Sequence, residues 1–290
     1  MRPDPSGAVR KTSGFPLLCL APDVKPDDVR FGELGYAREA RASYLDFCEA
    51  RKRGDIVEGV RFQVCLPTPM GVIYAFCTAR DIAAIERAYE AAVVREVEEI
   101  CRAIPHRDLC IQWDFCHEMI IWDGQPQDMF PLVHTSNAEI VARIARICEP
   151  IPPDVELGFH LCYGDFGAKH FIEPLDTGKM VEVMNAIAGA VAHDIAYFHL
   201  PVPMARHDEE YFRPLAGLKL PASTEIYLGL VHGKDGPEGT RRRIASARKF
   251  LDDFGIATEC GMARARTADV IKALLDVHLA TSAEPPPAGR

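Results

Sequence analysis

A histidine and two cysteines are the residues in this chain whose types and spacing best fit a metal site. His160 and Cys162 stand two residues apart at the end of an apolar run, and Cys260 follows a second short apolar run much later. Side chains alternate along a β-strand, so an imidazole and a thiol at this spacing lie on one face. One histidine and two thiolates suit zinc, with a fourth position left for water or substrate. The set predicts a catalytic zinc site.

Most of the other cysteines have a simpler interpretation. A His-x-Cys pair taken alone is more often core packing than a metal site, and a free thiol is among the most buried side chains. Small buried core residues are expected at Cys65, Cys77, Cys101, Cys110 and Cys148. Cys116 is left open because it stands in a polar string just beyond a predicted strand. No secretion signal is visible, so the ten cysteines are expected to be reduced thiols.

Length and composition restrict the class of protein. A chain of 290 residues with 48% hydrophobic residues is long enough for one α/β barrel, a fold of about 250 residues. The formal charge of −9 argues against nucleic acid as a partner. No apolar run approaches the roughly 18 residues of a membrane span. We therefore expect a cytoplasmic protein that binds neither membrane nor nucleic acid.

Predicted strands and helices alternate along the chain. Strands are predicted at residues 60–66, 108–114, 155–162, 195–200, 225–231 and 256–259, with 16–20 as a candidate seventh. Helices are predicted at residues 82–104, 136–147, 177–191, 208–212, 239–254 and 268–279. The arginines Arg241, Arg242 and Arg243 are expected on the solvated side of their helix. Such alternation predicts a parallel sheet with helices outside it.

The ends of the predicted strands are polar. They carry Thr68, Asp114, Cys162, His199, His232 and Cys260. In an α/β barrel, polar residues at the carboxyl ends of the strands mark the active-site face. An open doubly wound sheet would show a glycine-rich phosphate loop after an early strand, and none is found. We expect a TIM-type (β/α)8 barrel, complete or without its first strand–helix unit. The barrel should span residues 31–280, between an irregular segment 1–30 and a disordered tail 281–290.

Two strings that contain the candidate ligands resemble one family. His160-Leu-Cys-Tyr is similar to the His-Met-Cys-Tyr zinc motif of cobalamin-independent methionine synthase. Glu259-Cys260-Gly-Met-Ala-Arg264 resembles that family's Asp-Cys-Gly-Leu-x-x-Arg, which supplies the second zinc thiolate. The resemblance implies zinc as the cofactor, with His160, Cys162 and Cys260 as ligands.

Two further strings have the order and spacing of the same family. Ile111-Gln-Trp-Asp114 resembles its Ile-Gln-Ile-Asp, whose aspartate binds the amino group of homocysteine, and Cys65-Leu-Pro-Thr68 stands where the family has Gly-Pro-x-Thr. Together the four strings cover the chain from about Arg61 to the final helix. They imply the zinc-bearing (β/α)8 barrel of the catalytic C-terminal domain, within the uroporphyrinogen decarboxylase/methionine synthase-like superfamily.

The chain also departs from this family. The register that gives the family's glutamate zinc ligand gives His199 here, at the end of Ala196-Tyr-Phe-His199. We expect His199 to be the fourth ligand, or a pocket histidine with ordinary hydrogen bonds. The glutamate that follows the family's substrate aspartate is Phe115 here. Residues 1–30 are too short for two strand–helix units, so the chain is expected to be truncated at its N-terminus or to form an incomplete barrel.

The leading functional hypothesis is a zinc-dependent methyltransferase that activates a small thiol acceptor and takes the methyl group from a separate donor. Zinc coordination deprotonates a thiol at neutral pH. His199 would act beside the metal, and Asp114 would anchor a cationic group of the acceptor or cap the strand end. The candidate polar wall residues are Thr68, Tyr163, His134 and His232.

Two alternatives remain at this stage. One is a metal-free barrel enzyme of the decarboxylase branch, which needs arginines for substrate carboxylates. The other is a non-catalytic or degenerate barrel that binds zinc or a thiol without turnover. A homo-oligomer is compatible with the sequence.

Overall fold

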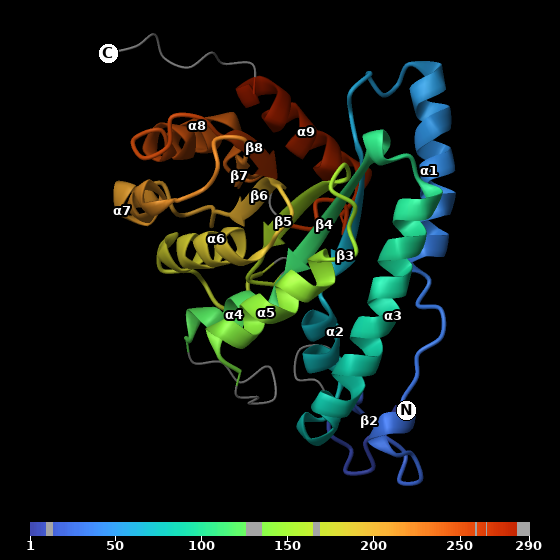
Figure 1. Ribbon diagram of the computed structural model, residues 1–290. Helices are drawn as coiled ribbons and strands as arrows, with labels where there is room; N and C mark the ends of the chain where they lie inside the picture. Colours follow the sequence, from blue (N-terminus) through green and yellow to red (C-terminus); the bar gives the residue numbers. More distant parts are fainter. Residues whose placement is uncertain (10–13, 126–134, 165–168, 259, 265, 283–290) are drawn as a thin grey trace.

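The computed structural model describes residues 1–9, 14–125, 135–164, 169–258, 260–264 and 266–282. Its centre is a six-stranded parallel sheet in which each strand pairs with the next one in the chain (Figure 1). The strands are β3 (Phe62–Pro67), β4 (Leu109–Phe115), β5 (Glu156–Leu161), β6 (Ile195–Pro201), β7 (Glu225–Val231) and β8 (Gly255–Thr258). All six strands predicted from the sequence therefore form, although Glu259, at the end of the last prediction, lies outside the described residues.

Helices follow the strands and cover one face of the sheet (Figure 1). They are α1 (Tyr36–Arg53), α2 (Pro69–Phe76), α3 (Ile82–Ala103), α4 (His117–Asp123), α5 (Asn137–Cys148), α6 (Gly178–Ala190), α7 (Glu209–Phe212), α8 (Gly236–Ala247) and α9 (Ala268–Ser282). The predicted tail began at residue 281, but Thr281 and Ser282 still belong to α9, and the rest of it lies outside the described residues. None of the described helices has the length and apolar character needed to cross a membrane.

The two faces of the sheet differ in polarity. Residues such as Leu66, Trp113 and Phe159 point toward the helices and are buried in the main hydrophobic core. Residues that alternate with these apolar ones, such as Gln63 on β3 and Gln112 on β4, point to the opposite, inner face. Gln63 is exposed there. This alternation is the period of two that a strand imposes. A closed barrel fills its interior with apolar side chains, whereas this sheet has a polar inner face.

The structure of the N-terminal region differs from the prediction in two ways. The candidate seventh strand forms only as β2 (Leu18–Cys19), which pairs antiparallel with β1 (Arg2–Pro3) in a separate two-stranded sheet. Helix α1 was not predicted, because only Ala37 and Ala40 on it are buried. Its N-terminus is instead stabilised by Glu96 on α3, whose carboxylate accepts hydrogen bonds from the backbone N–H groups of residues 34, 35 and 37. Within the described residues the barrel is thus partial, with β3 and β8 as its edges.

Two side-chain expectations were wrong. Cys77, Cys101, Cys110 and Cys148 are buried as predicted, but Cys65 is exposed, because it shares the inner face with Gln63. Arg243 is not solvated, since only 1% of its surface is exposed. Its guanidinium donates to the carbonyl oxygens of residues 230 and 204, at 2.9 and 2.7 Å, and pairs with Asp235 at 2.6 Å. These bonds tie α8 to the end of β7 and to the loop after β6.

The buried position of Arg243 gives a stability prediction. Arg243→Ala leaves two carbonyl groups and the Asp235 carboxylate without their donor, so the free energy of unfolding should fall by about 3–5 kcal/mol. Arg242→Ala is the matched control, because the side chain of Arg242 is 54% exposed, and it should change that free energy by less than about 0.5 kcal/mol. Urea denaturation followed by circular dichroism measures both. Equal effects of the two substitutions would contradict the structural role of Arg243.

Candidate metal centre

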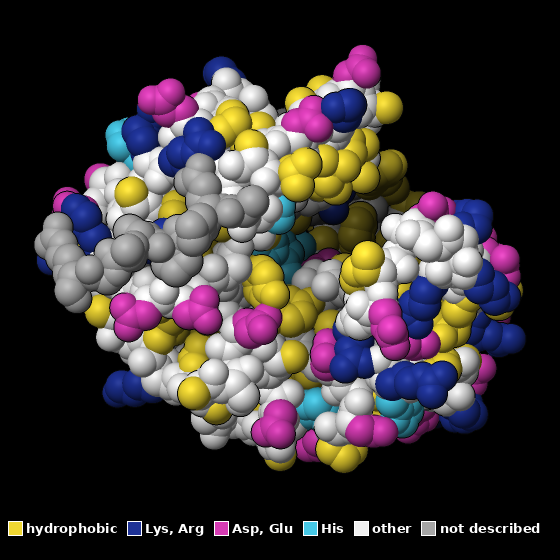
Figure 2. Space-filling model, turned by 90° about the horizontal axis from the view of Figure 1, so that it is seen from above, with side chains coloured by type: hydrophobic (Ala, Val, Ile, Leu, Met, Phe, Trp, Pro, Cys, Tyr) yellow, Lys and Arg dark blue, Asp and Glu magenta, His cyan; other side chains and the backbone are white. Residues whose placement is uncertain are grey.

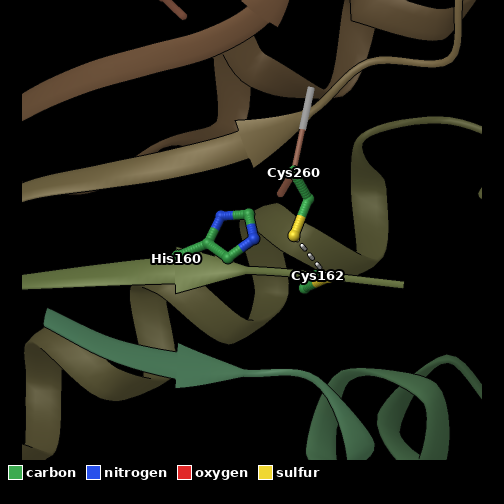
Figure 3. A group of neighbouring side chains, drawn as sticks. All are labelled: His160, Cys162 and Cys260. Atoms are coloured by element: carbon green, nitrogen blue, oxygen red, sulfur yellow. Dashed lines mark hydrogen bonds between the residues drawn. The ribbon is translucent and has the colours of Figure 1, made fainter. Parts of the chain in front are cut away.

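The structure brings the three candidate ligands together. His160 lies near the end of β5 and Cys162 directly follows that strand, while Cys260 comes just after β8 (Figure 3). One possible ligand atom from each of the three residues lies within 4.8 Å of the other two, and the two sulfur atoms are 3.7 Å apart. Strands β6 and β7 lie between β5 and β8 in the sheet. The ends of β5 and β8 can therefore meet only because the sheet curves.

The chemistry of the three residues fits zinc. Both ring nitrogens of His160 are buried and have no hydrogen-bond partner among the described residues. Burial lowers the pKa of His160 well below its ordinary value, which keeps the imidazole neutral, the form that binds a metal. Two sulfurs bound at about 2.3 Å in a tetrahedron lie about 3.8 Å apart, close to the observed 3.7 Å.

His199 lies directly beside this cluster. It is paired with His160 in the sheet register, and the two rings stack with their centroids 4.6 Å apart. Burial lowers the pKa of His199 to about 4, against a smaller opposite effect of a backbone hydrogen bond with Thr258. Its Nε2 atom has no hydrogen-bond partner among the described residues. His199 is not one of the three grouped ligands, so its role as a fourth ligand stays a prediction.

Cys116 adds a thiol that the sequence analysis left open. Its side chain hydrogen-bonds Cys162, and this bond is the largest of the effects that raise the pKa of Cys162 well above its ordinary value. The contact follows from the pairing of β4 with β5, because the Cys162 N–H donates to the carbonyl oxygen of Phe115 at 3.0 Å. Cys116 stands two residues after Asp114. Because side chains two residues apart along a strand share a face, this spacing could have placed Cys116 on the side of the sheet that carries the cluster.

Asp114 faces the same region. It is paired with His160 in the register of β4 and β5, and its carboxylate accepts a hydrogen bond from Gln112 at 2.8 Å. Burial raises the pKa of Asp114 to about 6, while Gln112 and the charge of Arg264 oppose this shift. The group is therefore mainly anionic at neutral pH, as binding of a cationic substrate group requires.

Thr68 caps a helix. It also contacts a buried carboxyl group that was not predicted from the sequence. Its hydroxyl donates to Glu118 on α4 and accepts a hydrogen bond from the backbone N–H of residue 71, which caps α2. Glu118 is only 1% exposed, and burial raises its pKa to about 7. The polar string that follows the predicted strand at Asp114 ends at Glu118. Glu118 itself received no predicted role, because the short helix α4 on which it lies was not predicted.

The other candidate wall residues are placed differently. The hydroxyl of Tyr163 is buried and donates to Asp123 at 2.8 Å, which supports a structural role. His232 lies 2.8 Å through Nε2 from the carbonyl oxygen of residue 202. His134 lies outside the described residues.

A cavity of about 370 Å³ opens beside the cluster at the carboxyl ends of the strands. Its lining includes Cys260, His232, the basic side chains of Lys169, Lys234 and Arg266, and one acidic side chain, Glu173, which pairs with His170. A ligand in this cavity reaches one of the two clustered thiols. Basic side chains outnumber acidic ones in this lining, which favours a substrate that carries a negative group.

Comparisons of the sequence with known proteins gave no relatives. The chain matches no protein-family model, and no curated protein matches it.

Solved structures do resemble the chain. One is a B12-independent methionine synthase from Shewanella sp. W3-18-1 in complex with selenomethionine, with 17% sequence identity and a TM-score of 0.59, over 88% of this chain and 67% of that one. Another is a putative vitamin-B12 independent methionine synthase from Listeria monocytogenes, with 16% identity and a TM-score of 0.49, over 77% of this chain and 63% of that one. The first match confirms the predicted resemblance at the level of the fold, a TIM-type α/β barrel that is partial in this chain.

The buried Glu118 carboxyl gives a prediction for pH dependence. Its folded-state pKa of about 7 lies above the ordinary value of 4.5, so the folded state binds more protons between these values. The contribution of Glu118 to the free energy of unfolding should therefore fall as the pH rises from about 4.5 to 7, by at most about 1.4 kcal/mol per pH unit.

Urea denaturation of the wild type and of Glu118→Gln across this range tests the prediction. The free energy of unfolding of the wild type minus that of the variant should fall across this range, because the amide of the variant does not titrate, while Asp114, His160 and His199 titrate alike in both proteins. Glu238→Gln, on an 84% exposed side chain, is the control and should behave as the wild type. Parallel curves for the wild type and Glu118→Gln would rule out Glu118 as the source.

Proposed function

We propose that this chain is a zinc-dependent methyltransferase that acts on the sulfur of a small thiol. The observation that carries the proposal is the cluster of His160, Cys162 and Cys260, with both His160 ring nitrogens buried and unpartnered among the described residues. The fold shared with a B12-independent methionine synthase supports the same reaction class.

His160, Cys162 and Cys260 would hold the zinc ion. Bound zinc lowers the pKa of a coordinated thiol, so that the sulfur is a nucleophile at neutral pH. The residues around the cluster bind and orient the acceptor. Asp114 holds an ammonium group of the thiol substrate, since its carboxylate lies in register with His160. His199 either completes the ligand set or, through the unpartnered atom Nε2, accepts a hydrogen bond from the incoming thiol before that thiol loses its proton.

The cavity beside Cys260 suits the rest of such a substrate. Its basic lining by Lys169, Lys234 and Arg266 provides partners for a carboxylate. An acceptor that carries a thiol, an ammonium group and a carboxylate uses all three features. The methyl donor is a second, separate small molecule.

Metal content tests the site itself. The wild-type protein should bind one zinc ion per chain, and Cys260→Ser should lose it while its far-ultraviolet circular dichroism stays unchanged, because one of the two thiolate ligands is gone. Cys65→Ser is the matched control, since Cys65 is an exposed thiol outside the cluster, and it should keep the zinc. Elemental analysis after dialysis measures all three. Zinc that survives in Cys260→Ser would place the metal elsewhere.

Methyl transfer tests the reaction. With zinc bound, the protein should accelerate formation of S-methyl product from homocysteine and methyl iodide, and Cys260→Ser should lose at least about tenfold of that acceleration. Asp114→Asn should mainly raise the KM for homocysteine, by roughly tenfold, because it removes the charge that holds the ammonium group. Zinc binding without any methyl transfer would instead favour a non-catalytic zinc-binding barrel.

A further inference from the structure

The polar inner face of the sheet encloses a second and larger cavity. Its volume is about 530 Å³, within the range of small-molecule sites. Its lining comes from β3 to β8 and includes Gln63, Gln112, Tyr197, His199, Glu225 and Tyr227. Figure 2 shows the molecule hollowed between its two halves, with histidine side chains visible at the floor of the hollow. The cavity includes His199 and therefore reaches the edge of the candidate metal centre.

Two tyrosines give this cavity its aromatic walls. The rings of Tyr197 and Tyr227 are perpendicular, at 83°, with centroids 5.8 Å apart. Glycines on the neighbouring strands make room for both rings, because a Cβ atom at Gly158 would lie 2.2 Å from the Tyr197 ring and one at Gly255 would lie 2.3 Å from the Tyr227 ring. The pair is thus fixed by the backbone around it.

Both tyrosine hydroxyls form hydrogen bonds with side chains of the cavity lining. The Tyr197 hydroxyl lies 2.8 Å from Oε1 of Gln63 and 2.9 Å from Oε1 of Gln112. The Tyr227 hydroxyl donates to Glu225 at 2.7 Å. The amides are neutral, whereas the Glu225 carboxylate carries a charge and has a second oxygen besides the Oε2 atom that Tyr227 contacts. The ring faces turned away from the glycines and this carboxylate are therefore the groups that can attract a ligand.

The charges on the lining favour a cation. Arg61 and Glu156 form an ion pair at 2.9 Å, so their charges offset each other. Glu225 forms no ion pair with a lysine or arginine within the part of the chain that the structure describes. One negative charge therefore remains beside the two aromatic rings.

We propose that this inner cavity is a binding site for a small methylated cation, a quaternary ammonium or tertiary sulfonium compound, held by the rings of Tyr197 and Tyr227 and the carboxylate of Glu225. Perpendicular aromatic walls with a nearby negative charge are how proteins recognise such cations. A methylated cation donates no N–H hydrogen bond, so it needs ring faces and charge rather than free acceptors. The site depends on neither the metal nor the reaction proposed above.

Isothermal titration with choline and with 3,3-dimethyl-1-butanol tests the site, because the second compound has the same shape without the charge. Choline should bind the wild type saturably and at least about tenfold more tightly than the neutral compound. The same result is expected in Cys260→Ser, which lacks a ligand of the candidate metal centre. Binding there separates this proposal from the proposed function.

Variants identify the groups responsible. Glu225→Gln, at an exposed position, should weaken choline binding about tenfold and leave the neutral compound unaffected. Tyr227→Leu should weaken choline by a similar factor. Glu209→Gln, on an exposed side chain of α7 that pairs with Lys249, is the control and should bind as the wild type does. Equal affinity for the two compounds, no saturable binding, or unchanged binding in both cavity variants would overturn the proposal.

Discussion

The alternation of side chains along the strands is the constraint on which the rest of the structure depends. Phe159 and Leu161 on β5 are buried against the helices, where each contributes about 1.5–3 kcal/mol to folding. A slip of one residue would turn them to the inner face, so the apolar face fixes the register. That register alone places His160 and Cys162 together on the inner face at the end of the strand, and the parallel order of the sheet brings the end of β8 to them.

Much of the fold follows from local patterns in the sequence. The six strands are short apolar runs bounded by turn residues, and α3 and α5 carry clear helical periodicity. Helix α1 could not be predicted in this way, because its start is satisfied by the remote carboxylate of Glu96. Arg243 was misjudged for a related reason, since its partners come from three separate places in the chain. The prediction for Cys65 was wrong because it assumed a closed barrel. In a closed barrel the inner face of the sheet, where Cys65 lies, would be buried.

The candidate site was predictable where strand ends supply it. His160, Cys162 and Cys260 each follow an apolar run, and the sheet brings them together. Cys116 and Glu118 follow β4 at the start of the short helix α4. The apolar residues there show no helical periodicity from which this helix could have been predicted. A buried polar group without a partner costs about 1–3 kcal/mol. Among the described residues His160 has two such nitrogens, and His199 beside the cluster has one. A metal ion that binds His160 would offset part of that cost, which ties the stability of the fold to the proposed chemistry.

The measurement that tests the central claim most directly is X-ray absorption at the zinc edge of the zinc-loaded wild-type protein. Coordination by His160, Cys162 and Cys260 predicts two sulfur scatterers at about 2.3 Å, with the rest of the first shell made of nitrogen or oxygen at about 2.0–2.1 Å. It also predicts outer-shell scattering from at least one imidazole ring. A first shell without sulfur, or one made of four sulfurs, would contradict the assignment of the metal to this cluster.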